Sequence, residues 1–207
     1  MIEIPSDWSI KTLGEITEIK ASNIDKKIVA DQKLILVCNY KDVVTNSRIT
    51  RRVNFLRSSA TPAQIKTFSL SRNDILLTKD AEVGRVSIVD DQITDLVCGY
   101  HLYQLRTLAK EVIPEYLLYS LQSFDIQTYF KKQRTGTTIA GLSRSALDAT
   151  RIPLPPLPEQ RKIAEIFLNL DNLIDKIDQK INKSQKILIA TTHDLLTKGI
   201  GHKKFKE

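Results

Sequence analysis

The sequence predicts an α+β protein, in which an irregular mixed α/β globular domain precedes one long coiled-coil helix. Strand-like and helix-like apolar runs follow each other through residues 1–151 without the regular alternation of a parallel doubly wound sheet. Four of the seven prolines lie in residues 152–158, and residues 159–198 contain no proline or glycine. We therefore expect a domain at 1–151, an extended junction at 152–158, a helix at 159–198 and a basic tail at 199–207.

Several short apolar runs predict strands in the domain. Residues 7–20 indicate a short strand followed by a helical turn, and Arg72-Asn73-Asp74 and Asp90-Asp91 indicate turns. Branched and apolar residues predict strands at the following positions: 34–37, 75–78, 86–89 and 100–105.

The pattern becomes helical after Pro114, a residue well suited to the first position of a helix. Apolar side chains recur at helical spacing from Tyr116 to Phe130, which predicts one helix that fades into a loop at 133–138. The prolines of 152–158 predict an extended chain there.

The apolar positions of residues 159–198 follow a heptad pattern, which slips near Ser184. A helix over 159–197 is about 58 Å long at 1.5 Å per residue, too long for a domain of this size to cover. It needs a partner helix, from another copy or another protein. The predicted pairing residues are Ile163, Ile166, Phe167, Leu170, Leu173, Ile174, Ile177, Ile181, Leu188 and Leu195.

The net charge of +7 is concentrated in two runs. Residues 41–57 hold five basic side chains and one acid, and residues 131–144 hold four basic side chains and no acid. Such runs indicate a face for a polyanion or, alternatively, two solvated loops. No apolar run approaches the roughly 20 residues that span a bilayer, and the N-terminus lacks signal-peptide features, so we expect a cytoplasmic protein.

The motifs of several enzyme classes are missing. There is no glycine-rich phosphate loop, no local serine-hydrolase motif and no Asn/Asp-Pro-Pro-Tyr/Phe segment of an adenine methyltransferase. Asp80, Glu82 and the Asp90-Asp91 pair are better explained as turn residues than as a nuclease cluster. Cys38 and Cys98 lack metal-ligand spacing and are expected to be buried thiols. We expect no catalysis, metal or cofactor in this chain.

The segment Ile152–Ala164 (IPLPPLPEQRKIA) closely resembles the junction between a target recognition domain and a conserved helix in specificity subunits of type I restriction-modification systems. The resemblance extends over essentially the whole chain. It is also carried, in order, by Ile4–Trp8 with Leu13–Ile16, Asn73–Leu76, Gly136–Ile139 with Leu142-Ser143, and Leu195–His202.

One departure concerns length. Members of that family usually carry two recognition domains and two such helices in about 400 residues, whereas this chain has one of each. We expect either a natural half-subunit, which would pair with itself, or the first half of a longer subunit.

The resemblance implies that the domain recognises one half of a bipartite double-stranded DNA target, while antiparallel helices hold two domains apart. It further implies modification subunits that methylate adenine with S-adenosylmethionine, and restriction subunits that use ATP and Mg²⁺. Two copies related by a two-fold axis would require identical, inverted half-sites.

Candidate DNA contacts follow from charge and from hydrogen-bonding groups. Basic side chains suit phosphates, whereas arginine, asparagine and glutamine suit base edges. The loop 133–138 combines such groups with a glycine that permits close approach. The candidates are Lys41, Arg48, Arg51, Arg52, Arg57, Lys79, Arg85, Tyr100, His101, Lys131, Lys132, Gln133, Arg134, Thr135, Gly136, Thr137, Thr138 and Arg144.

The main alternative is a coiled-coil adaptor whose globular domain binds protein and whose basic runs are merely solvated. DNA affinity that falls steeply with salt would separate the two hypotheses, because apolar helix pairing depends little on salt.

Overall fold

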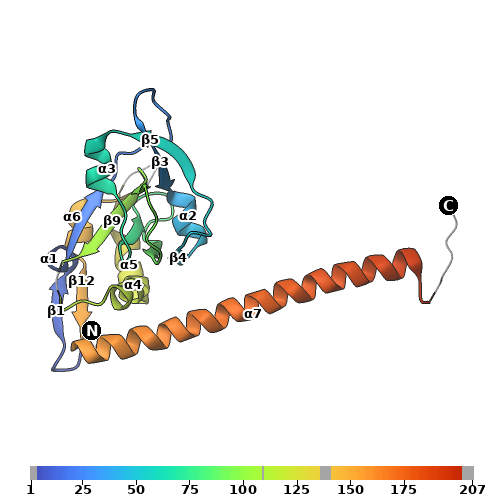
Figure 1. The fold of residues 1–207 in the computed structure, drawn as a ribbon. Helices are drawn as coiled ribbons and strands as arrows, with labels where there is room; N and C mark the ends of the chain where they lie inside the picture. The colour runs from blue at the N-terminus through green and yellow to red at the C-terminus, as the bar shows by residue number, and fades with distance from the viewer. Residues whose placement is uncertain (1–3, 109, 136–140, 202–207) are drawn as a thin grey trace. The chain divides into compact units, whose positions relative to one another are not determined.

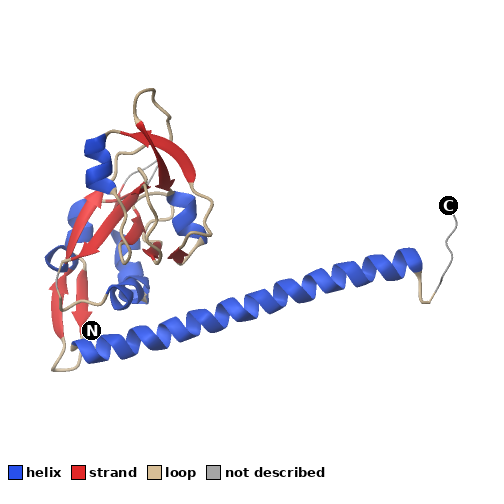
Figure 2. Ribbon diagram, in the orientation of Figure 1, coloured by secondary structure: helices blue, strands red, loops and turns tan. Residues whose placement is uncertain are grey.

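The computed structural model describes residues 4–108, 110–135 and 141–201 (Figure 1). The predicted α+β class is confirmed, with sheets in the globular part and one long C-terminal helix (Figure 2). The chain divides into two compact units, Met1–Ala164 and Glu165–Glu207. The first unit includes the first two turns of the long helix.

A five-stranded sheet forms the centre of the first unit, in the order β2-β9-β6-β7-β4. Strands β4 and β7 run parallel, and the other neighbours pair antiparallel. The strands are β2 Thr17–Ala21, β4 Arg48–Ile49, β6 Ile75–Thr78, β7 Val86–Val89 and β9 Leu102–Thr107. The predicted strands at 75–78 and 86–89 are confirmed to the residue.

The remaining strands of the described residues form three smaller sheets. A three-stranded sheet has the order β5-β3-β8, and β1 pairs with β12 and β10 with β11, both antiparallel. The strands are β1 Ser9–Thr12, β3 Lys33–Cys38, β5 Leu56–Ala60, β8 Leu96–Cys98, β10 Arg134–Thr135, β11 Gly141–Leu142 and β12 Arg151–Leu154.

The five-stranded sheet is buried on both faces, because β6 sends alternate side chains into two cores. Ile75 and Leu77 join the cluster that contains helix residues such as Leu117, whereas Leu76 joins the cluster of the three-stranded sheet. A strand covered on both faces must be apolar throughout, which explains why β6 was recognisable as a continuous apolar run.

The helices of the first unit are short. Their bounds are α1 Leu13–Ile16, α2 Tyr40–Thr45, α3 Pro62–Phe68, α4 Pro114–Gln122, α5 Phe124–Gln133 and α6 Arg144–Asp148. The prediction of one helix from Pro114 to Phe130 was wrong in one respect. Ser123 has extended backbone angles (φ −60°, ψ 150°) and divides it into α4 and α5.

The strand expected at 100–105 begins two residues later, at Leu102. Gly99, Tyr100 and His101 instead form a turn, in which the Leu102 N–H donates to the Gly99 carbonyl (3.2 Å). A Cβ at Gly99 would lie 2.7 Å from the Cys38 carbonyl oxygen, so only glycine fits there. Cys38 faces Cys98 across β3 and β8, and both are buried free thiols, as predicted. Burial raises the pKa of both.

Buried polar side chains fix the turn before β6. Asp74 is almost fully buried, and its carboxylate accepts hydrogen bonds from the Ser71 N–H (2.8 Å), Gln104 (2.8 Å) and both Nε and Nη2 of Arg106 (2.7 and 2.6 Å). This hydrogen bonding raises the pKa of Arg106. Asn73 adopts a left-handed conformation (φ 72°) in the same turn. The Asn73–Leu76 motif is thus a structural one.

The proline-rich junction is part strand and part helix. Strand β12 pairs with β1, with Pro153 opposite Ile10, and Tyr116 donates to the Pro153 carbonyl (2.6 Å). Helix α7 begins at Leu157 and ends at Lys198. The expectation that the chain is extended through Pro158 was wrong, because proline in the first turn of a helix removes a donor that has no intrahelical acceptor.

Gln160 anchors this first turn to the domain. Its side chain is 1% exposed, and its Oε1 accepts from the Ile113 N–H (3.0 Å). Its Nε2 donates to the carbonyls of Glu111 (2.8 Å) and Pro155 (2.9 Å). The Trp8 indole donates to the neighbouring Glu159 carboxylate (3.2 Å). The Glu159-Gln160 pair therefore contacts the domain directly.

The second unit consists of α7 from Glu165 and the residues after it. Nine of the predicted pairing residues lie in this unit, and all nine are exposed large hydrophobic side chains. Eight of them lie between Ile166 and Leu188, and the ninth is Leu195. Ile163 differs, because it packs against the core of the first unit. Gly199 ends the helix in a left-handed conformation (φ 64°). The basic residues of the tail after His202 lie outside the described residues.

Candidate nucleic-acid interface

The loop between β6 and β7, residues Lys79–Arg85, is held in one conformation. The Thr78 hydroxyl donates to the Glu82 carbonyl and accepts from the Arg85 N–H (3.0 Å). Gly84 has a left-handed φ of 87°, and a Cβ there would lie 2.8 Å from the Phe130 ring. The loop is therefore shaped by its own hydrogen bonds and by contact with α5.

Four side chains from this loop and from the turn before β9 form a contact group, which we call the Asp80-His101 cluster: Lys79, Asp80, Tyr100 and His101. His101 Nδ1 lies 3.0 Å from both carboxylate oxygens of Asp80. The Tyr100 and His101 rings meet edge to face, with centroids 5.0 Å apart. Lys79 Nζ lies 4.1 Å from the centroid of the Tyr100 ring, within cation-π distance.

The β10-β11 hairpin is attached to the same loop. Asp80 forms an isolated bridge with Gly141, and the Leu142 N–H donates to the Lys79 carbonyl (2.7 Å). Arg134 Nη2 donates to the Ala81 carbonyl (3.3 Å). Arg134, Gly141 and Leu142 therefore lie beside the loop that carries Lys79 and Asp80, whereas Gly136, Thr137 and Thr138 lie outside the described residues.

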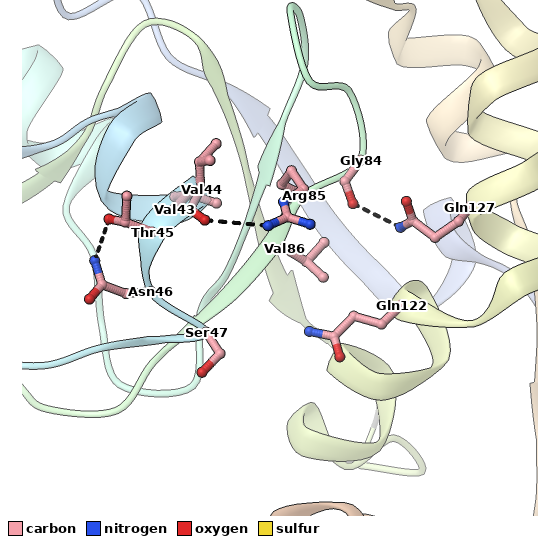
Figure 3. A pocket seen from close by; sticks show the side chains of 10 residues that line it. All are labelled: Val43, Val44, Thr45, Asn46, Ser47, Gly84, Arg85, Val86, Gln122 and Gln127. Carbon is pink, nitrogen blue, oxygen red and sulfur yellow. Dashed lines mark hydrogen bonds between the residues drawn. The ribbon is translucent and has the colours of Figure 1, made fainter. Parts of the chain in front are cut away.

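An open cleft of about 460 Å³ lies next to the loop (Figure 3). Arg85 points across it and donates to the Val44 carbonyl (3.5 Å), while Gln127 donates to the Gly84 carbonyl (2.8 Å). Gln122, Asn46 and several α2 residues complete the lining. Helix α2 is joined to the loop because the Tyr40 hydroxyl accepts from the Glu82 N–H (3.2 Å).

Five predicted contact residues are thus brought together around one loop: Lys79, Arg85, Tyr100, His101 and Arg134. Lys41 lies exposed in α2 beside Tyr40, and Lys131, Lys132 and Gln133 are exposed at the end of α5, which leads directly into Arg134. Thr135 lies in β10.

Other predicted residues lie elsewhere or already have partners. Arg51 bonds Asp91 and Gln92, at the opposite end of β7 from the loop, and Arg52 follows it. Arg48 is mostly buried and lies 3.3 Å from Asp90. Arg144 bonds Asp148 and the Ile19 carbonyl. Arg57 is exposed on β5, an edge strand.

Sequence reasoning did not include Asp80, Tyr40, Asn46, Gln122 or Gln127, which lie at the loop or the cleft, among the candidate contacts. Asp80 was treated as a turn residue, and the others carry no charge. The available signal was positional: Lys79-Asp80 directly follow the buried strand β6, and Tyr100-His101 follow the buried strand β8 after Gly99.

The comparisons with known proteins agree in one family. The model of the type I restriction modification DNA specificity domain matches residues 5–185. The chain belongs to this family. A Methanocaldococcus jannaschii protein named for the MjaX type I restriction enzyme specificity subunit is 30% identical over 99% of the chain and 49% of its own length. The EcoBI specificity subunit of Escherichia coli is 25% identical over 95% and 42%.

Solved structures from type I restriction-modification systems show the same fold. A chain from a study of assembly and conformational transition of the type I restriction-modification system has a TM-score of 0.72 at 19% identity, covering 96% of this chain and 47% of its own. The HsdS subunit from Thermoanaerobacter tengcongensis has a TM-score of 0.62 at 20% identity, covering 86% and 41%. The chain thus spans about half the length of the relatives it matches.

The described residues contain no group of three or more histidine, cysteine, aspartate or glutamate side chains that could hold a metal ion. No helix in the described ranges combines the length and apolarity needed to cross a membrane.

Proposed function

We propose that the first unit recognises one half of a bipartite DNA target and that α7 pairs with a second α7. The observation that carries the proposal is the exposed apolar row on α7 in a chain that belongs to the type I specificity family. The row from Ile166 to Leu195 extends over about 43 Å at 1.5 Å per residue. Apolar surface of that extent is typical of an interaction site.

DNA recognition is supported by the type and placement of the side chains around the Lys79–Arg85 loop. Lys79, Arg85 and Arg134 supply positive charge for phosphates, and the exposed lysines of α5 extend it. Tyr100, His101 and the amides of the cleft supply directional and stacking groups. We propose that the described residues of this loop, turn and hairpin form the DNA-contacting surface.

We propose a second copy of the chain as the partner of α7. Two copies related by a two-fold axis would use the same row of side chains, and the heptad spacing supplies such a row, with one slip near Ser184. Such a pair would present two identical domains, so the half-sites in the DNA must be identical and inverted.

The remaining roles follow from the family and are proposed for the complex. The polar face of α7 would contact the modification subunits, which methylate adenine with S-adenosylmethionine. Restriction subunits would supply ATP- and Mg²⁺-dependent cleavage. This chain would contribute specificity and no catalysis.

A salt series tests the DNA proposal. We expect the complex of this chain with its methyltransferase subunit to bind duplex DNA with an affinity that falls roughly a thousandfold between 50 and 200 mM salt, as for about six phosphate contacts. Affinity that is undetectable both for the chain alone and for the complex would favour the adaptor hypothesis instead. The pairing is tested separately by solution mass, and a strict monomer at micromolar concentration would contradict it.

A further inference from the structure

The Asp80-His101 cluster differs from the rest of the proposed surface in one respect. The contact with Asp80 determines whether a ring nitrogen of His101 donates or accepts a hydrogen bond. His101 Nδ1 is equidistant, at 3.0 Å, from the two oxygens of Asp80. An ionised carboxylate only accepts hydrogen bonds, so Nδ1 must carry the proton that it donates. A neutral imidazole in this arrangement has its lone pair on Nε2.

Backbone hydrogen bonds also fix the positions of the residues that carry the cluster. The Lys79 N–H donates to the His101 carbonyl (3.1 Å), and the Tyr100 N–H donates to the Ile24 carbonyl (3.0 Å). The side chain of Asp80 is only 18% exposed, whereas that of His101 is 48% exposed. Among residues 4–108, 110–135 and 141–201, no group is hydrogen-bonded to His101 Nε2. Asp80 thus holds the Nδ1 side of the ring, and the side chain of His101 remains partly exposed.

We propose that His101 contacts one base of the half-site through Nε2 and that Asp80 is the positioning residue that fixes its tautomer. This inference rests on the proposed DNA-recognition function. An acceptor at Nε2 matches the amino groups that adenine (N6) and cytosine (N4) present in the major groove. It does not match the O6 and N7 acceptors of guanine or the O4 acceptor of thymine.

Lys79 and Tyr100 have a different role in this arrangement. Lys79, held over the Tyr100 ring, brings a positive charge close to the cluster. Without it, the Asp80 carboxylate would repel the phosphates of an approaching duplex. The cluster can therefore use a carboxylate to orient a base contact and still bind a polyanion.

The test is a selection from a randomised duplex library by the complex with the methyltransferase subunit at about pH 8.5, where an ordinary imidazole is neutral. We expect one position of the half-site to prefer adenine or cytosine. In His101→Ala this preference should fall about tenfold while the other positions keep theirs. In Asp80→Ala the same position alone should lose part of its preference, because the imidazole is no longer held in one tautomer.

Lys66→Ala is the control, since Lys66 is an exposed residue of α3 outside the proposed DNA-contacting surface, and it should leave every position unchanged. Unfolding in urea, followed by Trp8 fluorescence, confirms that each variant is folded. If His101→Ala leaves the base preferences intact or weakens binding equally for all sequences, the inference is overturned and the proposed function stands. If the wild-type complex enriches no sequence, the proposed function itself is overturned.

Discussion

The contacts of Gln160 predict that one buried amide contributes a large part of the stability of the first unit. The change Gln160→Leu removes three hydrogen bonds and leaves the Ile113 N–H and the Glu111 and Pro155 carbonyls without this partner. Each buried group left unpaired costs roughly 1–3 kcal/mol. Allowing for partial relaxation, we expect a loss of about 3 kcal/mol in the free energy of unfolding.

Trp8 offers a direct assay, because it is the single tryptophan and its indole donates to Glu159, the neighbour of Gln160. With a denaturant slope of roughly 1–3 kcal/mol per molar urea, a loss of about 3 kcal/mol lowers the urea midpoint by about 1–3 M. The matched control is Gln179→Leu, at an exposed position of α7 outside the predicted pairing row. Equal midpoints for the two variants would refute the anchoring role of Gln160.

Three further predictions follow from the packing and burial. Arg106→Leu leaves the buried Asp74 carboxylate without its cation and should cost about 3 kcal/mol in the free energy of unfolding, the lower end for such a pair because Arg106 is partly exposed; a change within 0.5 kcal/mol would show that the pair is dispensable. Ile177→Asp places a charge in the pairing row and should convert the dimer to a monomer in solution-mass measurements, whereas an unchanged mass would remove Ile177 from the interface. Burial raises the pKa of Cys38 and Cys98, so a thiol reagent should modify neither until urea unfolds the protein, and fast modification of the native protein would contradict their burial.

The fold was predictable where the pattern of apolar residues along the sequence matches the burial of those residues in the structure. Every residue of β6 and β7 is buried, so β6 begins with three apolar residues and Ser87 alone interrupts the apolar residues of β7. The break at Ser123 was not predictable from periodicity, because apolar side chains continue at helical spacing through it and a change at one backbone position makes the turn.

The start of α7 shows a different limit. The prolines of the junction excluded helix in most positions, but Pro158 lies in the first turn, where proline costs little. Two of the three hydrogen bonds of Gln160 join segments that are distant in the sequence. Ile113 lies 47 residues from Gln160, and Glu111 lies 49 residues from it. No local pattern could have shown that this glutamine is buried.

The candidate interface was only partly predictable, for the same reason. The runs of basic residues identified two basic segments. Charge alone, however, does not show at which end of a strand a basic residue lies. Arg51 and Arg85 lie near opposite ends of β7. Arg48 forms an ion pair with Asp90. Asp80 and His101 are separated by 21 residues, and the loop and turn that carry them are brought together only by the pairing of β6 with β9.

The central claim is that two identical domains, joined through α7, recognise two DNA half-sites. The most direct measurement is the sequence that the assembled methyltransferase complex enriches from a randomised duplex library, determined together with the mass of the complex. We expect two identical, inverted half-sites at a constant separation and two copies of this chain in the complex. An enriched target without inverted symmetry, or a complex containing one copy of this chain, would contradict the claim.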